Sequence, residues 1–281
     1  MIPVKAMKEL KILHTTVSVG LEKPVELLHI TDTHLVLDDA RKSDRRRHFD
    51  HPEGSGQLES YLRQALDYAR ERNMPVIHTG DLIDCATDAA LAFARQQLAD
   101  VDCIYAAGNH DFCHWVGEAV EDLPYKQKML RKVAPWFPNN LYFHSRVIGG
   151  LNIVTLDDSY YRITDGQTDA LRAEAARGYP ILLCMHVPVY TPELAGMGDR
   201  VAFVLGAPEQ LLKDYPEKRR RTQTPDAATC RALAYMEAEP QIKAILAGHK
   251  HVNCEEPLSS GIMQYSTGGT YEGWARHITV I

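Results

Sequence analysis

The chain has 281 residues, of which 45% are hydrophobic and 24% are charged, and its formal net charge is −6 at pH 7. This composition is typical of a globular protein and excludes a disordered or fibrous chain. Two partners are disfavoured: a bilayer, because no apolar run reaches the roughly 18 residues that a spanning helix needs, and large nucleic acid, because its phosphates reward basic surfaces.

The N-terminal stretch MIPVKAMKELKILHTTVSVG lacks the apolar core and small-residue cleavage site of a secretory signal, so we expect a cytoplasmic protein with no membrane partner. The cysteines favour the same compartment. They are scattered without CxxC spacing, which indicates free buried thiols rather than disulfides or a thiolate zinc site. They are Cys85, Cys103, Cys113, Cys184, Cys230 and Cys254.

Short apolar segments that end abruptly in polar residues recur along the chain. Each has the length of a strand and is bounded by turn-forming residues, so each is predicted to be a buried strand. In chain order they span residues 25–30, 74–79, 101–107, 180–185 and 243–247.

The intervening segments have helical spacing. Residues 56–73 carry apolar side chains on one face, and Thr87 is a suitable N-cap for a helix over 88–100. Alternating strands and helices predict an α/β fold, which we expect to be a single domain over 1–281. In such sheets the loops beyond the carboxyl ends of the strands carry the functional groups.

These loops are rich in oxygen and imidazole donors. The set contains no cysteine, so it suits manganese, iron or zinc as a bound cofactor rather than a thiolate-bound structural zinc. A carboxylate shared between two ions would hold them about 3.5–4 Å apart, and Asp81 is the candidate for that bridge, with one oxygen for each ion. Asp32 and His34, two apart on a segment expected to be extended, should point to the same side. The candidate ligands are Asp32, His34, Asp81, Asn109, His186, His249 and His251.

The same loops carry recognisable motifs. DTH (32–34), GDLID (80–84), GNHD (108–111), His186 and GHKH (248–251) resemble, in order, the signature blocks of the calcineurin-like metallophosphoesterases. The resemblance implies an α/β/β/α sandwich, in which two mixed sheets are packed together with helices outside.

The resemblance also implies roles for individual residues. The first of two metal ions would be held by Asp32, His34, Asp81 and His251, and the second by Asp81, Asn109, His186 and His249. His249 and His251 would thus bind different ions. His110 would be the general acid or a phosphate-contacting group, oriented by Asp84, with Asp111 as the competing orienter.

We therefore expect a dinuclear metal-dependent phosphoesterase that cleaves a P–O bond through a metal-bound hydroxide. A small phosphodiester is the first choice of substrate, and a phosphomonoester or phosphoprotein is the second. The alternative from another class is a non-catalytic, metal-stabilised binding protein, which would be expected to lack at least one ligand. Metal identity and oligomeric state are not predicted.

Residues 187–242 are expected to form a lid or rim that sets specificity, through Tyr190, Arg200 or the run Arg219–Arg221. That run and Arg45–Arg47 have an alternative interpretation as solvated charged faces. Other candidates carry less weight. His14, His29 and His78 are expected to be packed in strands, and Tyr160 and Tyr161 in the core, whereas His114, Asp157 and Asp158 are weak candidates for the site.

Overall fold

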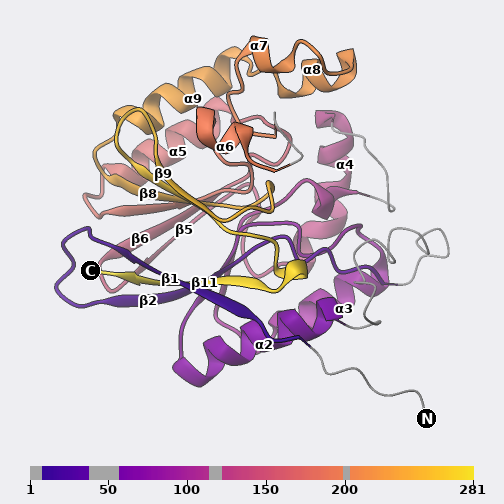
Figure 1. The fold of residues 1–281 in the computed structure, drawn as a ribbon, viewed down its shortest axis with the longest axis vertical. Helices are drawn as coiled ribbons and strands as arrows, with labels where there is room; N and C mark the ends of the chain where they lie inside the picture. Colours follow the sequence, from indigo (N-terminus) through magenta and orange to yellow (C-terminus); the bar gives the residue numbers. More distant parts are fainter. Residues whose placement is uncertain (1–7, 38–56, 114–121, 199–202) are drawn as a thin grey trace.

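The structure, a computed structural model, describes residues 8–37, 57–113, 122–198 and 203–281 (Figure 1). The predictions made for Arg45–Arg47, His114 and Arg200 lie outside these residues. None of the helices in the described ranges has both the length and the apolar character needed to cross a bilayer.

Two mixed sheets form the centre of the molecule. The strand orders are β1-β11-β2-β3-β4 and β5-β6-β7-β8-β10-β9. The first sheet contains β1 (Lys11–Val17), β11 (Trp274–Val280), β2 (Val25–Ile30), β3 (Val76–His78) and β4 (Cys103–Tyr105). The second contains β5 (Phe143–Ile148), β6 (Leu151–Leu156), β7 (Ile181–Cys184), β8 (Ile242–Ala247), β10 (Met263–Ser266) and β9 (Cys254–Pro257). The predicted strands are therefore confirmed as β2, β3, β4, β7 and β8.

Helices cover the outer faces of both sheets (Figure 1). The first sheet is covered by α2 (Gln57–Arg72), α3 (Asp88–Leu98) and α4 (Leu123–Val133), and the second by α5 (Asp165–Ala175) and α9 (Ala227–Ala238). The predicted α/β/β/α sandwich is confirmed. The shorter helices are η2 (His110–Phe112), η3 (Ala134–Trp136), α6 (Pro192–Gly196), α7 (Glu209–Leu212), α8 (Glu217–Gln223) and η4 (Thr270–Glu272).

Local sequence explains the two predicted helices. In α2 the apolar side chains at helical spacing, such as Leu58, Leu62 and Leu66, are buried against the first sheet. The helix α3 begins after Thr87, whose hydroxyl oxygen accepts the backbone N–H of Ala90 at 3.1 Å. This satisfies one of the N–H groups that the first turn leaves without an intrahelical partner, so the predicted N-cap is confirmed.

The two sheets enclose an apolar layer. Leu27 and Ile77 of the first sheet belong to the same buried cluster as Leu182 and Leu246 of the second. Burial on the inner face and under the helices explains why these strands read as nearly continuous apolar runs. Because β2, β3 and β4 pair in parallel, as do β7 and β8, the carboxyl ends within each group lie at one edge of the sheet.

The segment 187–242 is divided between two surroundings. The helix α9 packs Ala232 and Met236 into the outer core of the second sheet. Leu194, Val204 and Leu212, which come from α6, a loop and α7, form a separate small cluster. The expected role of the segment in specificity stays a prediction.

Candidate metal centre

The backbone at the candidate ligands is not extended. Asp32 and His34 have φ values of 49° and 51°, so the expectation of an extended segment there is wrong. Their backbone N–H groups instead donate to the carbonyls of Gly80 and Asp81, which fixes the two loops together. Positive φ costs of order 1–3 kcal/mol for a residue other than glycine and concentrates at functional sites. Positive φ values occur at Asp32, His34, Asp81, His249 and His251.

Glycines before the ligands let these loops pack closely. Gly80 has a φ of 95°, and a Cβ there would lie 2.5 Å from the backbone nitrogen of Gly108. A Cβ on Gly248 would overlap the carboxylate of Asp32. Both positions therefore require glycine, one for its conformation and both for space.

The first donor cluster joins Asp32, His34 and His251. His251 Nε2 lies 3.1 Å from Asp32 Oδ1 and 3.2 Å from His34 Nε2. His34 Nε2 is also 3.7 Å from Asp32 Oδ1 and 3.8 Å from Asp81 Oδ2. These distances give one enclosed position faced by the oxygen and nitrogen atoms of four residues.

The second donor cluster joins Asp81, His186 and His249. His186 Nε2 lies 3.2 Å from Asp81 Oδ2, 3.1 Å from Asn109 Oδ1 and 3.0 Å from His249 Nδ1. The rings of His249 and His251 therefore contribute to different clusters although they are two residues apart. They do so through different atoms, Nδ1 of His249 and Nε2 of His251.

Asp81 belongs to both clusters through a single oxygen. Its Oδ2 is the atom near His34 and His186, while its Oδ1 accepts the backbone N–H of His110 at 2.7 Å. The expectation of one oxygen for each ion does not match this arrangement. One shared oxygen would bring two ions closer together than a carboxylate that spans them with both atoms.

The donor atoms are arranged to bind cations rather than to form hydrogen bonds with one another. His186 Nδ1 lies 2.7 Å from the carbonyl oxygen of Thr79, which can only accept, so in a neutral ring Nδ1 carries the hydrogen. Its Nε2 then presents a lone pair to the oxygens of Asp81 and Asn109, which are acceptors too. Acceptors that face each other at about 3 Å need a positive charge between them. The set of carboxylate, amide and imidazole donors suits divalent or trivalent ions of the manganese, iron and zinc type.

The electrostatics of the clusters point in the same direction. Burial lowers the pKa of His186, but the charge of Asp81 and its hydrogen bond outweigh burial and raise this pKa to about 10. Burial likewise opposes charge on His34, and hydrogen bonds with Asp32 and Asp84 raise its pKa to about 9. Both clusters therefore hold bound positive charge, which protons supply in the metal-free protein.

This competition predicts proton release on metal binding. Metal ions bind the deprotonated rings. The ion in the first cluster therefore displaces a proton from His34, and the ion in the second displaces one from His186, whenever the pH is below about 9–10. We expect about two protons to leave per protein at pH 7.5, and the apparent affinity to fall steadily as the pH is lowered toward 5. Titration calorimetry of manganese binding in buffers of different ionisation enthalpy measures this. An affinity independent of pH, together with a binding enthalpy independent of the buffer, would contradict the assignment.

Several contacts that hold the ligand rings were not predicted. The Tyr161 hydroxyl lies 2.7 Å from His249 Nε2, and the Tyr271 hydroxyl lies 3.0 Å from His251 Nδ1. Such partners fix ring orientation and tautomer. Tyr161, which the sequence predicts to be a packing residue, lies in the core, and its hydroxyl also reaches the site. Nothing local in the sequence marks either tyrosine.

Asp158, a weak candidate from sequence, supports the second cluster. Its carboxylate accepts the backbone N–H groups of His186 at 2.9 Å and Val187 at 3.0 Å. Burial raises the pKa of Asp158 to about 7, despite the nearby His186. It positions the His186 loop rather than offering a free carboxylate to the centre. Asp157 lies apart and pairs with Lys126 at 2.6 Å.

His110 lies at the rim of the centre. Its side chain is 20% exposed, and its Nδ1 is 2.9 Å from Asp84 Oδ1. The same oxygen of Asp84 lies 3.0 Å from His34 Nδ1, so one carboxylate contacts both rings. Asp111, the competing orienter, instead accepts the hydroxyl of Tyr105 and the N–H of Gly108. The geometry therefore favours Asp84 as the partner of His110.

The remaining strand histidines have structural surroundings, as expected. Both ring nitrogens of His29 contact threonine hydroxyls. His78 contacts the hydroxyl of Thr33 and the N–H of Gly80, and burial lowers the pKa of His78 to about 3, which keeps the ring neutral. His14 lies against the ring of His277.

Comparisons with known proteins bear on the family and on the fold. The sequence profile of the family described as calcineurin-like phosphoesterase matches residues 25–253. The structure is similar to a dimetal phosphatase from Danio rerio, with a TM-score of 0.58 and 16% identity over 88% of each chain. It is also similar to the phosphopantetheinyl hydrolase from Mycobacterium tuberculosis, with a TM-score of 0.46 and 12% identity over 92% of this chain and 91% of that one. No curated protein matches the sequence. The first likeness shows a shared fold.

Proposed function

The chain belongs to the calcineurin-like phosphoesterase family of metal-dependent phosphoric ester hydrolases, and from this premise we propose that it hydrolyses a small phosphodiester at the two donor clusters. The observation that carries the proposal is that two clusters share one oxygen, Asp81 Oδ2. A shared carboxylate between two cation positions is the arrangement of two-metal hydrolysis. The ligands proposed for the ions are Asp32, His34, Asp81, Asn109, His186, His249 and His251.

We propose manganese, iron or zinc as the bound ions. When bound, such a pair supplies Lewis-acid activation of water and neutralises charge on the phosphate. The protein's own part is to hold the donors in place. His249 of the second cluster donates its backbone N–H to Asp32 Oδ2 of the first at 2.8 Å. This hydrogen bond joins the two clusters.

His110 is proposed to handle the proton of the leaving oxygen. Its Nδ1 faces Asp84, which leaves Nε2 as the atom available to a substrate at the rim. A carboxylate behind an imidazole fixes the tautomer and stabilises the charged ring, as a general acid requires. The backbone N–H of His110 donates to Asp81 Oδ1, which ties this residue to the carboxylate shared by both clusters. Asp84 acts as a positioning residue, since it reaches the substrate only through His110.

We propose a reducing, cytoplasmic compartment. None of the cysteines forms a disulfide, and Cys230 alone among them is exposed; they are Cys85, Cys103, Cys113, Cys184, Cys230 and Cys254. Buried free thiols persist where glutathione keeps them reduced, which supports this proposal. The net charge of −6 supports a small phosphate ester rather than large nucleic acid as the substrate.

A substrate comparison tests the proposed activity. We expect the protein, stripped of metal and refilled with manganese, iron or zinc, to hydrolyse bis(4-nitrophenyl) phosphate faster than 4-nitrophenyl phosphate. Release of nitrophenolate measures both rates. Faster cleavage of the monoester would make a phosphomonoesterase the better assignment. Failure to cleave either ester with any of the metals would reject the enzyme and favour a metal-stabilised binding protein.

A further inference from the structure

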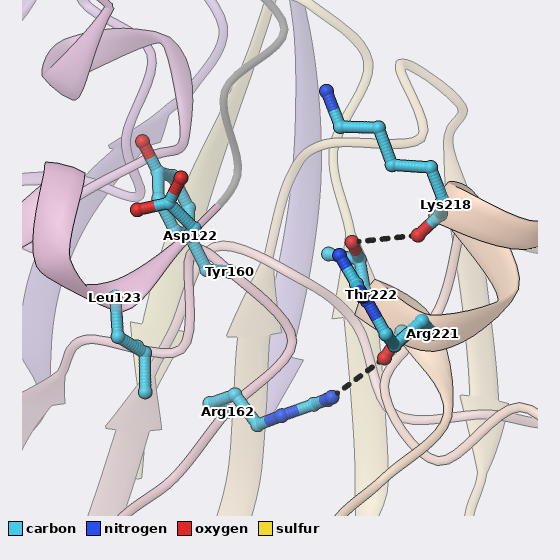
Figure 2. A pocket seen from close by; sticks show the side chains of 7 residues that line it. All are labelled: Asp122, Leu123, Tyr160, Arg162, Lys218, Arg221 and Thr222. Carbon is cyan, nitrogen blue, oxygen red and sulfur yellow. Dashed lines mark hydrogen bonds between the residues drawn. The ribbon is translucent and has the colours of Figure 1, made fainter.

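A cavity of about 270 Å³ lies outside the two donor clusters, between the start of α4 and α8 (Figure 2). Figure 2 shows the side chains from α8 on one side of the opening and those at the start of α4 on the other. Three cations, one carboxylate and two nonionic side chains dominate the lining. These are Arg162, Lys218, Arg221, Asp122, Leu123 and Tyr160.

One chain of contacts links this cavity to the second donor cluster. The Tyr161 hydroxyl contacts His249 Nε2 at 2.7 Å. The guanidinium of Arg162 donates to the carbonyl of Tyr161 at 2.8 Å and to the carbonyl of Arg221, on α8, at 3.0 Å. Arg162 thus connects the segment beside His249 to the helix that forms the cavity wall.

A second chain of contacts reaches α8 by another route. The ring of Phe203 lies 5.6 Å from that of His249, and the guanidinium of Arg219 stacks 4.6 Å from the ring of Phe203. Arg219 Nη1 is buried and finds no hydrogen-bond acceptor among the residues that the structure describes. Two independent contact chains therefore place the basic helix α8 beside the His249 side of the centre.

The charges in the cavity suit an anion. Asp122 uses its carboxylate as the N-cap of α4, where it accepts the N–H of Tyr125 at 2.7 Å. Arg162 is held by backbone carbonyls and lies 3.5 Å from Asp226, so it serves as framework. Lys218 and Arg221, both on α8, line the cavity as the cations that a ligand would meet. In the described part of the chain, the guanidinium of Arg221 forms no ion pair.

We propose that this cavity binds a second phosphate group of the substrate, while the ester that is cleaved lies at the metal centre. The inference rests on the proposed function and names its substrate class, an organic phosphate ester with a second phosphate on a spacer. Lys218 and Arg221 supply charge-assisted hydrogen bonds, which are the strong kind between cations and phosphate. Leu123, 48% exposed at the opening, offers apolar contact to the spacer.

Binding of matched nucleotides tests the inference. We expect metal-loaded protein to bind thymidine 3′,5′-bisphosphate about 10- to 100-fold more tightly than thymidine 5′-phosphate, the effect of one or two hydrogen bonds to charged groups. Titration calorimetry measures both affinities. The double variant Lys218→Gln/Arg221→Gln should lose most of that preference. The control Arg220→Gln removes a charge from an exposed position of α8 outside the lining and should keep it.

The outcomes separate this inference from the proposed function. Equal affinities for the two nucleotides in the wild-type protein, or a preference that the double variant retains, would overturn the subsite. Thymidine 5′-(4-nitrophenyl phosphate), with and without a 3′-phosphate, reports turnover on the same samples. Cleavage of both esters with no preference rejects the subsite alone. A binding preference without cleavage of either ester rejects the hydrolase and leaves the subsite standing.

Discussion

Replacing Asp81 by Asn is expected to remove bound metal and hydrolysis together. The carboxylate oxygen Oδ2 faces both donor clusters, so the substitution takes a negative charge from both at once. Asparagine has nearly the same shape and tolerates the φ of 55° at this position, so the loop should keep its backbone. We expect the loss of metal affinity to exceed the about 10- to 100-fold effect typical of residues that only support a ligand.

Metal content per chain, measured by mass spectrometry after dialysis, is the primary readout for Asp81→Asn, with hydrolysis of the diester as the second. Asp169→Asn makes the same chemical change at a side chain that is 71% exposed on α5 and should change neither. Circular dichroism checks that the variant folds. Retention of metal with full turnover would show that Asp81 does not join two ions.

Replacing His110 by Ala is expected to slow hydrolysis by about 10²–10⁴-fold, the usual size of assistance from a general acid or base. Metal content should stay near that of the wild type, because His110 lies at the rim and its ring contacts Asp84. The separation of rate from metal content distinguishes this residue from the ligands. His144→Ala, in β5 of the second sheet and away from the centre, is the matched histidine control.

A companion variant sharpens the role of His110. Asp84→Asn should also slow hydrolysis, and it should weaken metal binding as well, since the same Asp84 oxygen contacts His34 Nδ1. The pH dependence of the rate should change in both variants if His110 carries the proton. An unchanged rate in His110→Ala, or a loss of metal equal to that in Asp81→Asn, would refute its assignment as the acid.

Some of the structure was predictable because its causes are local. The strands that end at Ile30, His78 and Cys184 are apolar runs of strand length, and Thr87 caps a helix through an atom three residues away. Burial and capping of this kind act over a few residues, so the sequence carries their signal directly. The sandwich of two sheets was predictable only through the motif resemblance. Strand β1 pairs with β11, at the other end of the sequence, and such distant pairing leaves no local signal.

Other features required the assembled fold. The left-handed backbone at Asp32 and His34 depends on hydrogen bonds to the Gly80 loop, which lies far along the chain. Asp81 presents Oδ2 to both clusters, while its Oδ1 accepts the backbone N–H of His110. Tyr161 was predicted as a packing residue because its partner, His249, is 88 residues away. Contacts between distant loops leave no periodic or local trace.

The central claim is that two ions share Asp81 while His249 and His251 hold different ones. Anomalous diffraction from crystals of the manganese-loaded protein tests it directly. We expect two peaks at most about 4 Å apart, with Asp81 Oδ2 bound to both, His249 Nδ1 on one and His251 Nε2 on the other. A single peak, or both rings on the same ion, would contradict it.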